Sequence, residues 1–409
     1  MKASMVSTVS LIGALALLTV THAQRPPSIN TALSLTLEPI SAPAGPNTSE
    51  PQMTVQGDRV ILSWLELGGR RTSLKFSERT PSGWTEARTA AAGDDFMVNA
   101  ADVPSVRRLA DGSLVAHWLQ QDGADPESYK LRLSWSRDEG GSWSPSITPH
   151  RDRVQAQHGF GSLFQVPGAG LGLVWLDGRA IPPDAPEGVG NMALRAATFD
   201  ASGKFVKESV VDARVCECCP TAAAETSDGV IVAYRGRTAG EIRDIHVTRL
   251  VNGHWTPPVA VHRDGWMINA CPVNGPAVGA HGRDVGVAWF TAKEETGHAF
   301  VAFSHDGGNT FGSPTRLDDA SSLGRVGVTL LGDGSAVAGW VEFTSENQPS
   351  ILMVRRVNAN GARGPAIRVA ELGGMRYPRV ARSGNELLIA WTETEKGGPR
   401  VRTARAMAH

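Results

Sequence analysis

The chain has 409 residues, of which 41% are hydrophobic and 20% are charged, and it contains 45 glycines and 25 prolines. This composition is typical of many short strands joined by tight turns and argues against a protein built from long helices. The formal net charge is -1, which excludes an overall field that would attract nucleic acid or an anionic membrane.

The first 23 residues have the pattern of a signal peptide. Lys2 precedes an apolar run from Leu11 to Val20, and Ala23 ends a small-residue cleavage site. The run is shorter than the roughly 20 apolar residues that a transmembrane helix needs. We therefore expect residues 1–23 to be removed, residues 24–31 to form a flexible leader, and the mature protein to be a periplasmic or secreted monomer without membrane insertion.

An apolar strand that ends in an aromatic residue recurs along the chain with a period of about 54 residues. The aromatic residues are Trp64, Trp118, Trp175, Tyr234, Trp289, Trp340 and Trp391. Each lies in a hairpin, often with an Asp-Gly or Gly-Asp turn, and further short strands follow. Such a unit cannot bury both of its faces alone, so the units must stack around an axis. The repeat predicts an all-β, seven-bladed β-propeller of four-stranded antiparallel blades over residues 32–409.

The two ends of the chain are expected to meet in the last blade. The last unit starts at Arg376 and leaves room for only three strands before His409. Residues 32–39 alternate apolar and polar side chains ahead of the first complete unit. We expect this N-terminal strand to complete the last blade and close the ring.

The turn after the third strand has the pattern Ser-x-Asp-x-Gly-x-x-Trp/Phe at residues 136–143 and 304–311. In such a turn a short acceptor side chain caps backbone N–H groups and glycine takes a positive φ. Weaker copies surround Asp200 and Asn252. These turns resemble the BNR or Asp-box repeat, whose best-known members are sialidases, and the likeness covers nearly all of the mature chain.

That resemblance implies a sialidase-like propeller whose Asp boxes are structural and lie on the face away from the active site. Sialidases use an early Arg-Ile-Pro motif, three arginines that hold a carboxylate, a Tyr nucleophile paired with Glu, and an Asp acid/base. This sequence has no Arg-Ile-Pro motif, so the catalytic signature is not matched. Tyr377 is the candidate catalytic nucleophile, with Arg179, Arg237 and Arg376 as the candidate arginines.

Polar residues gather where loops meet at one mouth of the predicted channel. Two residues after the repeated aromatic stand Glu66, Gln120, Asp177, Glu342 and Glu393. Asp177, Arg179, Arg235, Arg237 and Arg376 are candidate ligand-binding residues, suited to an anionic sugar or a peptide. The structural alternative is that each carboxylate bonds backbone or an arginine of the next blade.

All four cysteines lie in two consecutive loops between blades, with Cys216, Cys218 and Cys219 in one and Cys271 in the next. In an oxidising compartment they most simply form a disulfide that joins the two loops. The alternative is a thiolate metal site for copper or zinc, because Cys-x-Cys-Cys with a distant fourth cysteine offers soft ligands. A redox-active pair is a third possibility.

Three histidines in neighbouring loops, His150, His158 and His262, are further candidate metal ligands. The sequence therefore favours an exported propeller that binds a small molecule, a glycan or a metal ion at the channel mouth through the cysteine loops. The alternatives are an exo-acting glycoside hydrolase of the sialidase type and a non-catalytic interaction scaffold.

Overall fold

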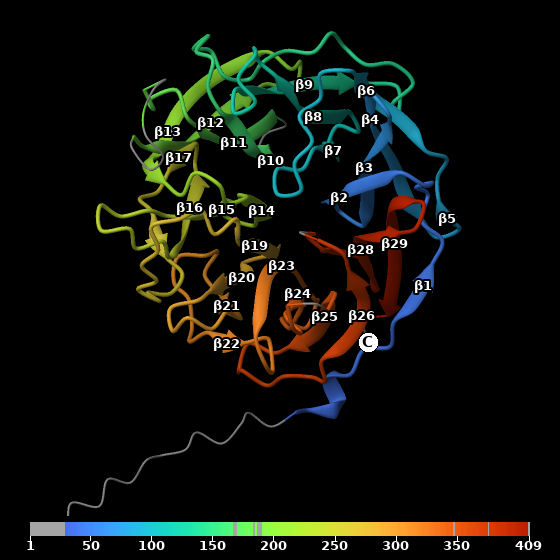
Figure 1. Cartoon of the computed structure of the whole chain (residues 1–409), viewed down its shortest axis with the longest axis vertical. Helices are drawn as coiled ribbons and strands as arrows, with labels where there is room; N and C mark the ends of the chain where they lie inside the picture. Colours follow the sequence, from blue (N-terminus) through green and yellow to red (C-terminus); the bar gives the residue numbers. More distant parts are fainter. Residues whose placement is uncertain are drawn as a thin grey trace, which may run out of the picture.

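The computed structural model describes residues 29–166, 170–182, 185, 190–346, 348–374 and 376–407. The predicted signal peptide and most of the leader lie outside the described residues. Within the described part, the strands form seven antiparallel sheets arranged in a ring (Figure 1), which confirms the seven-bladed β-propeller. No helix in this part is long and apolar enough to span a membrane.

The first three blades follow one another along the chain. Blade 1 consists of β2 (Thr48–Gln56), β3 (Arg59–Gly68), β4 (Arg71–Thr80), β5 (Gly83–Trp84) and β6 (Arg88–Gly93). Blade 2 consists of β7 (Ser105–Arg108), β8 (Leu114–Gln121) and β9 (Tyr129–Ser136), with an isolated bridge from Leu133 to Ile147 in the position of a fourth strand. Blade 3 consists of β10 (His158–Val166), β11 (Gly170–Asp177), β12 (Met192–Phe199) and β13 (Phe205–Val215).

The remaining four blades complete the ring. Blade 4 consists of β14 (Ala222–Thr226), β15 (Gly229–Arg235), β16 (Ile245–Val251), β17 (His254–Trp255) and β18 (Val259–Ala260). Blade 5 consists of β19 (Ala277–His281), β20 (Asp284–Thr291), β21 (His298–Ser304) and β22 (Thr315–Arg316). Blade 6 consists of β23 (Ser322–Leu330), β24 (Ala336–Glu342), β25 (Ser350–Val357) and β26 (Ile367–Leu372). Blade 7 consists of β27 (Arg379–Ser383), β28 (Glu386–Glu395), β29 (Gly398–Met407) and the N-terminal β1 (Glu38–Ile40).

The ring closes as expected, but with a shorter N-terminal strand than residues 32–39. Strand β1 pairs with β29, with Glu38 opposite Arg405 and Ile40 opposite Thr403. The preceding residues Thr31–Leu33 form a 3-10 turn. Leu33 and Leu35 are buried, and Leu35 packs against apolar side chains of blades 6 and 7. The alternation of leucines in this segment therefore reflects packing of an irregular segment, and only its end pairs as a strand.

The repeated aromatic residues form the contacts between blades. All seven are buried, with exposed fractions between 0% and 8%. Each lies on the second strand of its blade, as Trp175 does on β11 and Trp289 on β20. A buried aromatic ring contributes a large apolar area to such a contact. The blade-to-blade core therefore follows the sequence repeat.

Three inner strands have a β-bulge near their first residues. The register shifts occur after Ser49 in β2, after Gly159 in β10 and after Gly324 in β23. The residues Glu50, Phe160 and Arg325 have positive φ values of 52°, 55° and 52°. A bulge of this kind re-aims a side chain at the rim of a sheet. These bulges place Glu50 and Arg325 near the channel end discussed below.

The two turns that match the Asp-box pattern share one hydrogen-bond arrangement. Asp138 Oδ1 accepts from the N–H of Ser142 at 2.9 Å, and Asp306 Oδ1 accepts from the N–H of Thr310 at 2.9 Å. In the second turn, Gly307 donates its N–H to Arg283 O in the β19–β20 turn. The Asp-box turns therefore lie at the end of the ring that carries the turns between first and second strands.

Candidate functional site

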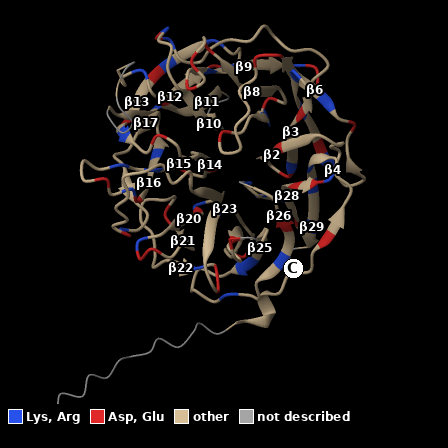
Figure 2. Ribbon diagram, viewed as in Figure 1, with Lys and Arg blue, Asp and Glu red and all other residues tan. Residues whose placement is uncertain are grey.

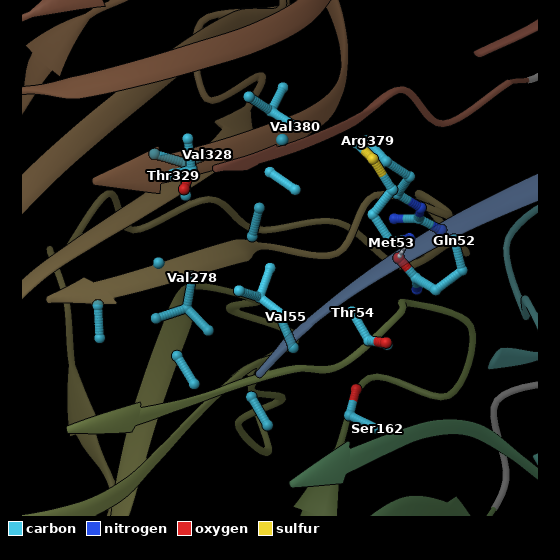
Figure 3. A pocket seen from close by; sticks show the side chains of 18 of the residues that line it. Gln52, Met53, Thr54, Val55, Ser162, Val278, Val328, Thr329, Arg379 and Val380 are labelled. Atoms are coloured by element: carbon cyan, nitrogen blue, oxygen red, sulfur yellow. Dashed lines mark hydrogen bonds between the residues drawn. The ribbon is translucent and has the colours of Figure 1, made fainter. Parts of the chain in front are cut away.

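The inner strands line a channel along the axis of the ring, with a cavity of about 650 Å³. Gln52, Ser162 and Arg379 are among the side chains that face it (Figure 3). One end of this channel is crossed by Tyr377, which is 5% exposed and donates its hydroxyl hydrogen to Val273 O. Because Tyr377 leads into blade 7 and Val273 leads into blade 5, this bond spans the channel end.

The four cysteines gather beside this covered end, on the face opposite the Asp-box turns. Cys216, Cys218 and Cys219 belong to the connection between β13 and β14, and Cys271 belongs to the connection between β18 and β19. The Sγ atom of Cys216 lies 3.9 Å from that of Cys218 and 3.4 Å from that of Cys219. All three sulfur atoms lie within 4.8 Å of one another. The thiol of Cys271 interacts with that of Cys218.

The predicted disulfide between the two loops is not confirmed, because all four cysteines are free thiols in the structure. A disulfide requires two sulfur atoms about 2.05 Å apart, and even within the first loop Cys216 Sγ and Cys219 Sγ are separated by 3.4 Å. Cys218 and Cys271 are the pair that meets across the two loops. The structure thus brings together the four cysteines that the sequence singled out, as a cluster of thiols.

The sulfur atoms lie among hydrogen-bond donors that stabilise a thiolate. Arg243 Nη1 donates to Cys216 Sγ at 3.2 Å, and the N–H of Asn274 donates to Cys219 Sγ at 3.3 Å. The pKa of Cys216 is lowered well below its usual value by hydrogen bonds from the thiols of Cys218 and Cys219 and by the charge of Arg235. Cys216 is therefore the sulfur best prepared to act as an anionic ligand.

Arg235, a predicted ligand-binding residue, holds the loop that carries Cys271 in place. It is 1% exposed, and its guanidinium donates to Asn274 O, Phe290 O and Arg243 O at 2.6–2.9 Å. These acceptors belong to the connection that carries Cys271, to β20 and to the β15–β16 loop. Arg235 thus fixes the position of Arg243 beside Cys216.

Arg237, also a predicted ligand-binding residue, belongs to an ion network next to the cysteines. It pairs with Glu241 at 2.9 Å and with Glu217 at 3.5 Å. Arg243 pairs with the same two carboxylates, at 3.0 Å from Glu217 and 2.9 Å from Glu241. Sequence analysis missed Arg243, Glu241 and Asn274. Arg243 and Glu241 could have been found from the alternating charges in the loop that follows Tyr234.

Asp177 and Arg179 lie in a different cluster, on blade 3 and the loop that enters it. Arg179 Nη2 lies 2.6 Å from Asp177 Oδ2 and 2.9 Å from Asp152 Oδ2. His150 and His158 also contact Asp152, and their rings stack with centroids 3.7 Å apart. Burial and the neighbouring His158 together lower the pKa of His150 to about 4. The two histidines therefore form a cluster with Asp152 that is distinct from the cysteine cluster.

His262 is the third predicted histidine ligand and contacts an acidic neighbour. Its Nδ1 atom lies 2.8 Å from Asp264 Oδ1, and its ring stacks on Trp289. The other oxygen of Asp264 accepts from Trp289 Nε1 at 2.8 Å. His262 is thus held on the side of blade 5.

The carboxylates that follow the repeated aromatics have structural partners within their own blades. Asp177 accepts from Trp175 Nε1 at 2.7 Å, and Glu342 accepts from Trp340 Nε1 at 3.2 Å. Two further pairs, Glu66 with Lys75 and Glu393 with Arg402, join neighbouring strands of one blade. These contacts are structural, but they differ from the expected ones, because the partners are side chains of the same blade and neither backbone nor arginines of the next blade.

Arginines surround Tyr377, although only one of them is an arginine predicted for this role. The guanidinium groups of Arg325 and Arg379 each lie 5.8 Å from the centre of the Tyr377 ring. Arg376 pairs with Glu50 at 3.4 Å. Burial raises the pKa of the Tyr377 hydroxyl well above its usual value. Arg179 forms its ion pairs at blade 3, and Arg237 forms its ion pairs at blade 4.

Comparisons with known proteins support the fold alone. No protein-family model and no curated protein matches the sequence. The structure is similar to that of the polysaccharide lyase Uly1, with a TM-score of 0.53 and 12% identity over 88% of this chain and 90% of that chain. It also resembles an α-L-arabinanase of Penicillium chrysogenum (TM-score 0.49, 14% identity, 76% and 95% coverage). A mutant of the NanB sialidase of Streptococcus pneumoniae gives a TM-score of 0.47 at 9% identity, with 86% and 84% coverage. The likeness to Uly1 concerns the fold alone, and an identity this low transfers no activity.

Proposed function

We propose that this protein is an exported β-propeller that binds a soft metal ion, Cu(I) or Zn²⁺, through Cys216, Cys218, Cys219 and Cys271. The observation that carries the proposal is the convergence of three sulfur atoms within 4.8 Å of one another, with a fourth thiol against Cys218. Thiolates are the ligands that these two metals share. Export follows from the signal-peptide pattern of residues 1–23.

The spacing of the sulfur atoms suits the binding of one metal ion that they share. Zinc bound to thiolates has Zn–S distances of about 2.3 Å, which places tetrahedral sulfur ligands about 3.8 Å apart. The separations of 3.4 Å and 3.9 Å from Cys216 Sγ bracket that value. Small adjustments of the side chains are enough to bring the sulfur atoms to a single ion.

The charges around the cluster also suit a thiolate centre. Arg243 donates directly to Cys216 Sγ, and the buried Arg235 lies close by. Two thiolates bound to Cu(I) carry a net negative charge, as do four bound to Zn²⁺, and cations beside buried anions offset their desolvation. The acidic neighbours Glu217 and Glu241 are already paired with arginines.

The experiment is metal analysis of the reduced protein after anaerobic loading with Cu(I) or Zn²⁺ and desalting. We expect wild-type protein to retain metal, and Cys216→Ser and Cys219→Ser variants to lose it. His262→Gln serves as the matched control, because His262 contacts Asp264, and it should bind as wild type does. Retention of no metal by folded, fully reduced wild-type protein would refute the proposal.

A second candidate function is glycoside hydrolysis of an anionic sugar at the channel end. One observation favours it: Arg325 and Arg379 flank Tyr377, so positive charge surrounds the candidate nucleophile. The hydrogen bond from Tyr377 to Val273 O and the raised pKa of its hydroxyl weigh against direct attack. Cleavage of a fluorogenic sialoside by wild type but not by Tyr377→Phe would establish this activity, and no cleavage by either would dismiss it.

A further inference from the structure

On the side that faces the channel, packed side chains cover the cysteine cluster. Asn274 is 4% exposed, donates its N–H to Cys219 Sγ, and donates through Nδ2 to Leu323 O at 2.9 Å. Its side-chain oxygen accepts from the N–H of Arg325 at 2.8 Å. Tyr377 covers the same side through its bond to Val273 O. A metal ion that reaches the sulfur atoms therefore has to come from the outer side.

On the outer side, the four sulfur ligands are graded by burial. Cys271 is exposed and Cys218 is half-buried, whereas Cys216 and Cys219 are each 1% exposed. Because Cys271 contacts Cys218 and Cys218 contacts Cys216, the thiols form a continuous series from solvent to the interior. Such a series allows an ion to pass inward by exchanging one sulfur ligand at a time.

The loop that carries Cys271 presents a second soft donor to solvent. Met267 is 71% exposed and forms a bridge with Ile242, next to Glu241. A thioether is a weak ligand for most metals but suits Cu(I). The exposed face beside the cluster thus offers a thiol and a thioether within one loop.

Contacts between protein groups hold the ring and the loop that carries Cys271 in place. Strand pairing of β1 with β29 closes the ring, and Arg235 joins the Cys271 loop to β20 and to the β15–β16 loop through bonds to three backbone carbonyls. One of the four thiols, Cys271, is exposed to solvent, so an external ligand can reach an ion bound to it.

From these observations we infer that Cys271 is the entry ligand of a Cu(I) transfer site, which receives its ion from a carrier with thiol or thioether ligands or gives it up to one. This inference rests on the proposed metal-binding function. In this inference Cys271 determines the rate of Cu(I) exchange, whereas Cys216 and Cys219 determine the affinity for Cu(I).

The test measures the rate and the equilibrium of Cu(I) transfer separately, with the Cu(I)–bicinchoninate complex as the donor to reduced, full-length mature protein. We expect Cys271→Ser to slow transfer by about 10-fold or more while affinity changes less than the rate does. Cys219→Ser should instead weaken affinity. Cys271→Met should restore most of the rate, because a thioether can still capture Cu(I).

Ala270→Ser is the matched control, since it adds a hydroxyl to the same exposed loop and keeps the thiol; it should transfer at the wild-type rate. A Cys271→Ser protein that loads as fast as wild type would overturn the inference while leaving metal binding intact. A wild-type protein that takes no Cu(I) would instead overturn the proposed function itself. Circular dichroism and thermal unfolding of each variant establish that its fold is unchanged.

Discussion

Arg243 is the residue whose position most directly supports a metal-binding cluster. Its guanidinium donates to Cys216 Sγ at 3.2 Å and is held by Glu217 and Glu241. Groups that orient metal ligands typically change metal affinity 10–100-fold when they are removed. We therefore expect Arg243→Gln to weaken Cu(I) affinity by about that factor in a chelator competition.

Arg237→Gln is the control for this prediction, because Arg237 pairs with the same two glutamates. Its effect on metal affinity should be several-fold smaller. Equal losses in the two variants would show that the ion network acts only by holding the loop, and that the contact from Arg243 to sulfur has no separate role.

The burial of His117 predicts how the free energy of unfolding depends on pH. The imidazole is 1% exposed, its Nδ1 atom lies 2.9 Å from Ser105 Oγ, and burial lowers its pKa from 6.5 to about 4. The unfolded chain binds this proton below about pH 6.5 and the folded chain only near pH 4, so stability falls as the pH falls through this range. At about 1.4 kcal/mol per pKa unit, the loss is about 3 kcal/mol.

Chemical denaturation at about pH 7 and about pH 4.5 tests this dependence. The difference in unfolding free energy between the two values should be smaller in His117→Gln than in wild type. His150, whose pKa is also lowered to about 4, acts in the same direction and leaves a residual dependence in the variant. Identical differences in both proteins would contradict the assignment.

At this scale, the sequence identified the cysteines that lie together but not the residues that contact them. The four cysteines could be predicted to meet, because consecutive loops between blades emerge on the same face of a propeller. Their contacts with Arg243 and Asn274 could not, since these depend on how three loops fold over one another. The pairing of Arg179 with Asp177 and with Asp152 of the β9–β10 connection could not be predicted either, because it depends on how that connection folds over blade 3.

Among the elements, the turns at residues 136–143 and 304–311 give a prediction that is independent of the proposed metal site. Asp306 accepts from the N–H groups of Asn309 and Thr310, and from the Thr310 hydroxyl at 2.7 Å. These bonds lower its pKa, although partial burial acts in the opposite direction. Loss of such a cap typically costs about 1–2 kcal/mol.

We expect Asp306→Ala to lower the unfolding free energy by about 1–2 kcal/mol in urea denaturation. Asp138→Ala should have a similar effect, because its turn makes the same type of bonds. Metal stoichiometry should be unchanged in both variants, since the turns lie at the other end of the ring. A loss of metal binding with unchanged stability would be inconsistent with a purely structural role.

The strands were more predictable than the segments between them. Period-two alternation and the recurring aromatic identify each second strand, because both record burial between blades. The N-terminal strand was predicted too long, since the leucines before Glu38 alternate to pack as irregular chain and not to pair. Burial produces the same alternation of apolar and polar residues in a paired strand and in a packed irregular segment. Only backbone hydrogen bonds distinguish the two.

For the whole molecule, closure of the ring by β1 is the feature that makes the seven blades one structure. Without it, β29 becomes an exposed edge that can pair with other chains. A mature chain that starts at residue 42 loses this strand and the buried Leu33 and Leu35. At about 1.5–3 kcal/mol for each buried leucine, the unfolding free energy should fall by about 3–6 kcal/mol.

A chain that starts at residue 29 is the control for this truncation, because it keeps β1 and its leucines. Thermal unfolding and light scattering after gel filtration should show a lower melting temperature and association only for the shorter chain. Equal melting temperatures would mean that β1 contributes little to closure.

The molecule as a whole has almost no net charge, so any charged partner has to be recognised by local groups. Acidic and basic residues are interspersed around the ring (Figure 2), in keeping with the formal net charge of -1. The ring itself could be predicted from the repeat, and so could the face on which the cysteines lie. The covered channel end could not, because it depends on one hydrogen bond from Tyr377 to Val273, far apart in sequence.

X-ray absorption at the metal edge, recorded on reduced protein loaded with one equivalent of Cu(I) or Zn²⁺, tests the thiolate centre most directly. Sulfur bound to these ions scatters at about 2.3 Å and nitrogen or oxygen at about 2.0–2.1 Å. We predict a shell of sulfur atoms alone, which loses intensity in Cys216→Ser. A shell dominated by nitrogen or oxygen, unchanged in that variant, would place the metal elsewhere and contradict the account.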